Sequence, residues 1–219
     1  MNEYIVKRLE GELPDIRGRL FDPDIEMKGV AYAPIDLYPW DETGYTPEGR
    51  AYVFYNDEGL HALLCAKEAT IAAAETRFCG NVCCDSCLEF FVAPRPEVSL
   101  SYINMESNIL SAMYYSYGES RYDRRKPERL PDGVNPTASA HEGGWWAVCY
   151  HVPMSVLKSE YALDALSTGM EMRANFYHCD ETIHPNFGSW NPIPVEKPDF
   201  HQPEHFGRLI LSGETVSFG

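Results

Sequence analysis

Residues 85–93 read DSCLEFFVA, and this stretch decides the fold because the character of its side chains alternates. Successive side chains of an extended strand point to opposite faces. The even-numbered residues from Ser86 to Val92 therefore form a mainly apolar face. The other face carries Glu89 together with Asp85, Cys87 and Phe91. This pattern predicts a β-strand that packs its apolar face against a core.

Two further stretches repeat the pattern. In YINMESN, residues 102–108, Ile103 and Met105 share a face with Ser107, and the opposite face carries Tyr102, Asn104, Glu106 and Asn108. In MEMRANFY, residues 170–177, the polar face carries Glu171, Arg173, Asn175 and Tyr177. None of the three polar faces contains lysine, which is unusual for a plain solvated surface.

The remaining short alternating runs indicate an all-β chain. Strands are predicted at 51–55, 60–67, 86–93, 99–108, 110–117, 145–152, 170–178 and 206–212, with a tight turn at Asn56–Gly59. One or two helical turns are expected at 153–159, and long loops at 118–135 and 180–201. Eight or more strands without helical spacers predict an antiparallel, jelly-roll-like β-sandwich, which we expect to be a single domain over residues 1–219.

Composition and charge exclude several classes of partner. The formal net charge is −15, so the surface repels phosphate backbones and anionic membranes; we expect no nucleic-acid and no membrane partner. Residues 1–20 contain no apolar signal-peptide segment, and the seven cysteines are an odd number. A cytoplasmic protein with reduced thiols and without structural disulfides is therefore expected.

The polar faces of the strands predict a binding site for a sugar or oligosaccharide. A sugar hydroxyl both donates and accepts hydrogen bonds, so carboxylate acceptors with amide or guanidinium donors complement it. An aromatic ring stacks on the apolar face of a sugar, and Trp190 is the candidate for that role. The alternative is that these groups form cross-strand pairs on a solvated face. The predicted ligand-binding residues are Glu89, Glu106, Asn108, Arg173, Asn175 and Trp190.

An ordered set of motifs, covering about residues 50–212, resembles the family-nine carbohydrate-binding modules. The motifs are DSCLEFF at 85–91, YINMESN at 102–108, residues 145–157 with Val152-Pro153, RANFY at 173–177, Ser189-Trp190 and FHQPEHFG at 200–207. The resemblance implies a non-catalytic sugar-binding sandwich with a shallow site. Glu89, Glu106, Asn108 and Trp190 fall where the family places sugar-binding groups. No cofactor is expected from the residues themselves, although bound calcium occurs in the family.

The chain departs from the family pattern at three positions. A stacking aromatic is expected just ahead of the Asp-Ser pair, where Val82, Cys83 and Cys84 stand. Glu106 occupies a position at which sugar-binding modules have arginine. Cys149 replaces a carboxylate four residues before Pro153. The resemblance therefore predicts the fold more firmly than it predicts the ligand.

Three alternatives remain open beside sugar binding. Cys79, Cys83, Cys84 and Cys87 could bind a metal or act in redox chemistry, although structural zinc usually draws ligand pairs from separate segments. Glu89 and Glu106 could form a glycosidase pair, although the resemblance supplies no catalytic acid. A protein–protein interaction module without a small ligand is the third. The chain contains no GxSxG, P-loop or HExxH motif.

Overall fold

The computed structural model describes residues 1–139 and 144–218. Within them the chain forms thirteen strands, two short α-helices and two 3-10 turns. The strands are β1 (Glu3–Glu10), β2 (Ala33–Ile35), β3 (Glu48–Asn56), β4 (Gly59–Lys67), β5 (Cys87–Ala93), β6 (Tyr102–Ser107), β7 (Met113–Gly118), β8 (Arg124–Arg125), β9 (Thr137–Ala138), β10 (Trp145–Pro153), β11 (Glu171–Asp180), β12 (Asn186–Ser189) and β13 (Gly207–Ser217). The helices are α1 (Pro23–Glu26) and α2 (Met154–Tyr161), and the 3-10 turns are η1 (Val82–Cys84) and η2 (Pro203–His205).

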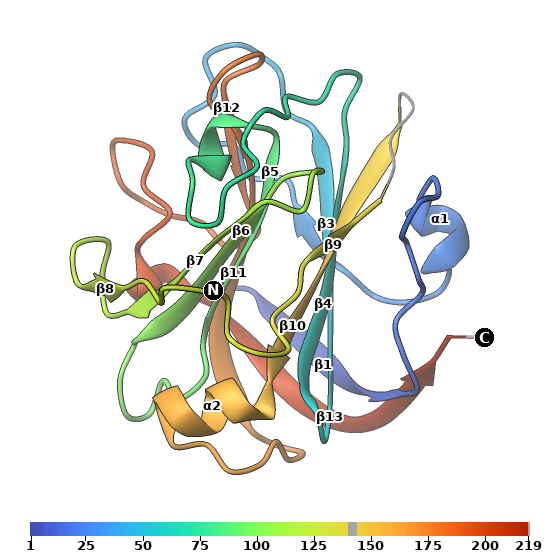
Figure 1. Ribbon diagram of the computed structural model, residues 1–219, viewed down its shortest axis with the longest axis vertical. Coiled ribbons are helices and arrows are strands. Elements are labelled where there is room, and N and C mark those ends of the chain that lie inside the picture. The colour runs from blue at the N-terminus through green and yellow to red at the C-terminus, as the bar shows by residue number, and fades with distance from the viewer. Residues whose placement is uncertain (140–143, 219) are drawn as a thin grey trace.

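The strands form one sheet that curls into two facing layers. Its order is β8-β7-β6-β5-β11-β13-β1-β3-β4-β10-β9, with β12 beside β11 and β2 beside β3. In Figure 1, β5, β6, β7 and β11 form one layer, β3, β4 and β10 form the other, and β1 and β13 join them. The predicted all-β sandwich is confirmed.

The sheet is mostly antiparallel, as predicted, and becomes mixed at one strand of the described chain. The N-terminal strand β1 lies between β13 and β3 and pairs in parallel with both, whereas the other strand pairs are antiparallel. Sequence analysis did not predict β1. In the structure Tyr4 and Val6 are buried between more exposed neighbours. This alternation is typical of a strand, but the charged residues at both ends of the segment make it hard to recognise in the sequence.

The main core lies between the two layers. It contains the inward residues of β5, β6 and β11, among them Leu88, Phe90, Met105 and Phe176, together with residues of β3, β4 and β10. The predicted alternation of these three strands is confirmed, since every second side chain enters this core. Their outer faces carry a second buried cluster, however, in which Phe200 and the loop after β12 take part.

A buried polar contact links the two layers. Nε2 of His178 on β11 lies 2.5 Å from Oε1 of Glu68, which follows β4. The indole nitrogen of Trp146 on β10 donates to the other oxygen of Glu68 at 3.0 Å. Asn186 Oδ1 lies 2.8 Å from His178 Nδ1. Buried charged groups require such partners, so this contact fixes how the layers face each other.

All eight predicted strands are present, with ends displaced by a few residues. Residues 99–108 contain β6, residues 110–117 overlap β7, and the turns expected at 153–159 correspond to α2. The predicted loops at 118–135 and 180–201 contain β8 and β12. These strands, of two and four residues, are too short to show a period, although they pair with β7 and β11. The described helices include none that is long and apolar enough to cross a membrane.

Candidate functional site

A pocket of about 170 Å³ opens on the outer face of the β5-β6-β11 layer. Glu89 of β5, Glu106 of β6 and Cys179 of β11 contribute from the sheet itself. Loops on three sides complete the pocket. Its lining residues are Gly80, Asn81, Cys83, Glu89, Glu106, Tyr114, Arg121, Arg124, Cys179, Glu181, Phe187, Pro198, Asp199, Phe200 and His201.

Two buried carboxyl groups stand side by side in this pocket. Glu89 and Glu106 are directly opposite each other in the β5-β6 register, and they are only 2% and 7% exposed. Burial, reinforced by the neighbouring Glu106, raises the pKa of Glu89 well above its usual range. Burial raises the pKa of Glu106 to about 7. The pair therefore holds a proton near neutral pH, so one oxygen can donate a hydrogen bond while the others accept.

The hydrogen-bond partner of Glu89 is a thiol rather than a cation. Cys179 Sγ donates to Glu89 Oε1 at 3.2 Å, and Cys179 lies opposite Cys87 in the β5-β11 register. Burial raises the pKa of the Cys87 thiol to about 12. These sulfurs are consequently protonated at neutral pH and behave as weak donors.

Arginine and histidine form the opposite wall. Arg124 lies over the Tyr114 ring at 5.5 Å, and its Nη1 is 3.4 Å from the ring nitrogens of His201. Burial, with a further contribution from Arg124, lowers the pKa of His201 to about 2, so the imidazole is neutral. The hydroxyl of Tyr102 lies 2.9 Å from His201 Nδ1. This wall offers guanidinium donors beside neutral polar rings.

The pocket thus combines carboxyl groups, a guanidinium group and aromatic walls on a β-sandwich. The sequence model of carbohydrate-binding family 9 matches residues 21–211 of the chain. The chain belongs to carbohydrate-binding family 9. The match confirms the family that the ordered motifs predicted, and it extends the resemblance toward the N-terminus by about thirty residues.

Several solved structures share the fold of this chain. A Bacteroides uniformis protein, described as a candidate carbohydrate-binding protein, has a TM-score of 0.77 and 24% identity over 96% of this chain and 99% of that one. A family-9 module of Caldicellulosiruptor kristjanssonii in complex with glucose has a TM-score of 0.66 and 12% identity, over 97% of each chain. The complex of such a module from the same organism with cellotriose has a TM-score of 0.65 and 11% identity, over 96% of this chain and 95% of that one. At these identities the likeness establishes the fold. A search of the curated proteins finds no match.

The structure separates the six sequence-predicted residues of this family-9 chain. Glu89 and Glu106 line the pocket, as proposed for a sugar site. Asn108 is fully buried beyond the end of β6, where its amide donates to Asp85 Oδ2 at 2.7 Å and to the Glu75 carbonyl at 2.8 Å. Its oxygen accepts from the backbone nitrogens of Leu110 and Ala112. Asn108 therefore stabilises a turn beside the pocket.

Arg173 and Asn175 lie away from the pocket. Arg173 is opposite Ala93 in the β5-β11 register, and its guanidinium donates to the Phe206 carbonyl at 3.0 Å. Asn175 is buried and exchanges two hydrogen bonds with the backbone of Asn191, at 2.8 and 3.1 Å. Sequence alternation placed both residues on the outer face of β11, as predicted. The pocket covers only part of that face and does not include either residue.

Trp190 is a core residue, which corrects the prediction that its ring is open to a sugar. It is 3% exposed, its ring centroid lies 5.2 Å from that of Phe176, and it belongs to the core between the layers. A side-chain carbon at Gly207 would come within 2.5 Å of the indole, so glycine is required there. The backbone nitrogen of Trp190, directly after β12, donates to the Phe176 carbonyl of β11, and this pairing holds the indole on the inner side of the layer.

Sequence reasoning missed Arg124, Arg121 and Asp199, which lie in segments predicted as loops. Arg121 Nε is 3.9 Å from Asp199 Oδ1 at the pocket rim. No periodic signal places a loop residue over a particular strand, so only the folded chain brings them together. His201, within the FHQPEHFG motif, is held in place by its hydrogen bond to Tyr102.

The cysteine motif divides into three environments. Cys79 donates to the Tyr115 carbonyl at 3.3 Å, Cys83 and Cys84 lie near Glu181, and Cys87 lies with Glu89 and Cys179. All seven cysteines are free thiols. In the described part of the chain, both groups of three or more metal-type side chains contain two cysteines. Calcium takes six to eight oxygen ligands, so neither group fits it, and calcium stays a prediction of the family resemblance.

Proposed function

We propose that this family-9 protein binds one sugar unit, free or at the end of an oligosaccharide, in the pocket formed over β5, β6 and β11, and that it does so without catalysis. The observation that carries the proposal is the buried Glu89–Glu106 pair facing Arg124 in that pocket. Membership of a carbohydrate-binding family supports it.

The chemistry of the pocket complements sugar hydroxyls. A hydroxyl that donates to one carboxylate oxygen can accept from the protonated neighbour or from the Arg124 guanidinium. Tyr114 and Phe187 supply apolar walls for the C–H face of a sugar ring. The groups stand on paired strands, so their positions are fixed before the ligand arrives, which lowers the entropic cost of binding.

A non-catalytic role is supported by the placement of the two carboxyl groups. A glycosidase sets its acid and its nucleophile or base on either side of the scissile bond. Glu89 and Glu106 instead project from the same face of adjacent strands as a directly opposed pair. Both therefore approach a bound sugar from the same side. Cellotriose incubated with the protein should remain intact when the products are separated by chromatography.

The binding experiment uses glucose and cellotriose as probes, because the two Caldicellulosiruptor complexes contain these sugars. Calorimetric titration should give a dissociation constant around 1 mM, about 4 kcal/mol, since the rings of Tyr114 and Phe187 are only partly exposed to a ligand. Replacing Arg124 by alanine removes a charged donor and should weaken binding about 10-fold to 100-fold.

Arg173→Ala is the matched control, since this arginine lies on the same layer outside the pocket. It should bind both sugars as the wild type does. Equal losses in the two arginine variants would place the sugar elsewhere on the layer. Absence of heat and of chemical-shift changes with both sugars and with a glycan array would refute the proposal.

A further inference from the structure

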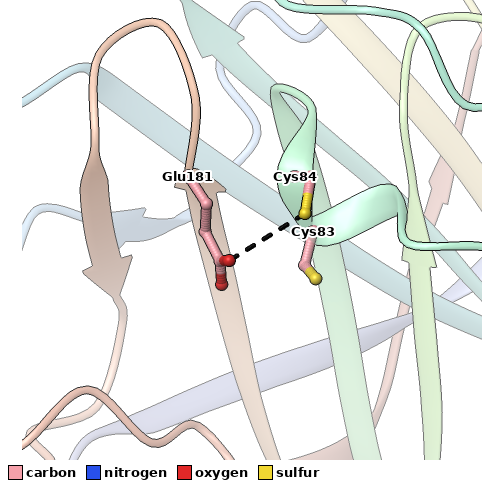
Figure 2. A group of neighbouring side chains, drawn as sticks. All are labelled: Cys83, Cys84 and Glu181. Carbon is pink, nitrogen blue, oxygen red and sulfur yellow. Dashed lines mark hydrogen bonds between the residues drawn. The ribbon is translucent and has the colours of Figure 1, made fainter.

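We propose that Cys83, Cys84 and Glu181 form a binding site for a thiophilic divalent cation of the Zn²⁺ class at the wall of the pocket. The two cysteines come from the 3-10 turn η1, and Glu181 directly follows β11. Figure 2 shows Glu181 reaching from the end of its strand toward the two cysteines on the neighbouring turn. The site is separate from the groups proposed to bind the sugar hydroxyls.

The distances suit one small ion. One ligand atom from each of the three residues lies within 4.8 Å of the other two, and Cys84 Sγ is 4.0 Å from Glu181 Oε2. Zinc bonds of about 2.3 Å to sulfur and about 2.0 Å to oxygen place those two atoms about 3.5 Å apart at a tetrahedral ion. Small side-chain rotations are therefore enough to close the site.

Both segments that present the ligands are held by carboxylate-to-backbone hydrogen bonds. Asp85, directly after η1, accepts from the backbone nitrogens of Ala74 and Glu75 at 3.0 and 2.9 Å. Asp180, directly before Glu181, accepts from the backbone nitrogens of Thr182 and Ile183. The ligands thus come from two anchored segments that are nearly a hundred residues apart in sequence. Structural zinc usually draws its ligands from separate segments in this way, whereas Cys79, Cys83, Cys84 and Cys87 all lie in one segment.

The donor set selects the kind of ion. Two thiolates and one carboxylate favour zinc or cadmium over calcium and magnesium, which take oxygen ligands. Cys83 and Glu181 also line the pocket, so the fourth position of the ion faces the pocket and is filled by water. Cys83 and Cys84 are half-buried and Glu181 is exposed, which leaves the ion a path from solvent.

The surroundings favour a cation. Cys83 lines the same pocket as the carboxyl groups of Glu89, Glu106 and Glu181, and negative charges gathered there repel one another. A dication offsets this repulsion and binds the sulfurs as thiolates, so each ion that binds releases the two thiol protons to the buffer. The neighbouring group Cys87, Glu89 and Cys179 is almost completely buried, and its Glu89 is already assigned to the sugar.

The experiment is a Zn²⁺ titration of the reduced full-length chain in competition with a chromophoric chelator, without sugar. We expect one zinc per chain and a release of about two protons, obtained from calorimetry in buffers of different ionisation enthalpy. Co²⁺ in place of Zn²⁺ should produce sulfur-to-cobalt charge-transfer absorption. Ca²⁺ should not compete.

Variants locate the ligands. Loss of an outer-shell partner already weakens metal affinity about 10-fold to 100-fold, so Cys83→Ser and Cys84→Ser should each weaken zinc binding about 100-fold or more. Glu181→Gln should weaken it about 10-fold. Cys149→Ser is the matched control, because Cys149 is also half-buried but lies on β10 in the other layer; it should bind zinc as the wild type does.

The proposal is overturned if reduced protein binds no stoichiometric zinc at micromolar concentration. It is also overturned if the Cys83→Ser/Cys84→Ser double variant, shown by circular dichroism to be folded, keeps wild-type affinity, or if Cys149→Ser loses as much. Because these experiments contain no sugar, none of these results bears on the proposed sugar binding, which is tested separately.

Discussion

The inner and outer faces of β5, β6 and β11 are built from the same alternating strands but serve different purposes. On the inner face, side chains such as Phe90, Met105 and Phe176 pack only into the core between the layers. On the outer face, Glu89, Glu106 and Asn104 are buried as well. The outer face is therefore not the solvated surface with cross-strand pairs that stood as the alternative to a binding site.

The difference arises from what covers each face. The inner face meets the other half of the sheet, whereas the outer face is covered by the short strands and loops that carry Arg124, Phe187, Phe200 and His201. This irregular cover leaves the pocket described above. Polar groups at the edge of this pocket lose water without gaining full hydrogen-bond partners, and that is why the carboxyl pKa values rise.

Trp190→Ala tests the inner face and should have the largest effect on stability. Removing a buried aromatic ring that packs on Phe176 leaves a cavity, so we expect a loss of about 3–5 kcal/mol in the free energy of unfolding, measured by urea denaturation. Tyr122→Ala is the control, because Tyr122 is 94% exposed and its loss should change stability by less than about 0.5 kcal/mol. A Trp190 variant of normal stability that no longer binds sugar would reverse the assignment of this residue to the core.

Asn108→Ala tests whether an outer-face amide supports the fold. It removes four hydrogen bonds and leaves the Asp85 carboxylate with one partner fewer in a buried position. We expect a loss of about 2–3 kcal/mol in the free energy of unfolding. Sugar affinity, measured at a temperature where the variant is folded, should change less than it does in Arg124→Ala. The opposite ranking would return Asn108 to the binding site.

Glu106→Gln tests the carboxyl pair through pH. The folded pKa of Glu106, about 7, lies above that of an exposed glutamate, so the folded state binds the proton more tightly than the unfolded state. This contribution to stability is complete below about pH 4.5 and is lost as pH rises through 7.

Wild-type protein should therefore lose about 2–3 kcal/mol of unfolding free energy between pH 5 and pH 8 that Glu106→Gln does not lose. Parallel urea denaturation series at several pH values measure the difference. Curves of equal slope for the two proteins would show that the pair is ionised at neutral pH.

Arg173→Ala should have the smallest effect. The guanidinium donates to a backbone carbonyl at a partly exposed position, so its loss should cost about 0.5–1 kcal/mol of stability. The same variant serves as the binding control above. A large loss of stability would mean that Arg173 orders the N-terminal residues it contacts, which include Met1, and thereby the parallel strand β1.

The sequence by itself determined the eight longer strands that were predicted and the faces of three of them. Alternation in residues 85–93, 102–108 and 170–177 predicted which side chains enter the core, and the structure confirms it because side-chain direction in a strand depends only on position. The ordered motifs also predicted the family. Glu89 and Glu106 were found because both lie on regular strands.

Only the tertiary structure decided what covers the outer face and where the site ends. Loop residues such as Arg121 and His201 have no period that fixes their position, and Trp190 enters the core because its backbone pairs with Phe176 of β11. The pairing of Cys83 and Cys84 with Glu181 likewise depends on β5 lying beside β11. Local sequence sets the direction of each side chain along a strand, whereas contacts between distant segments arise only when the sheet closes.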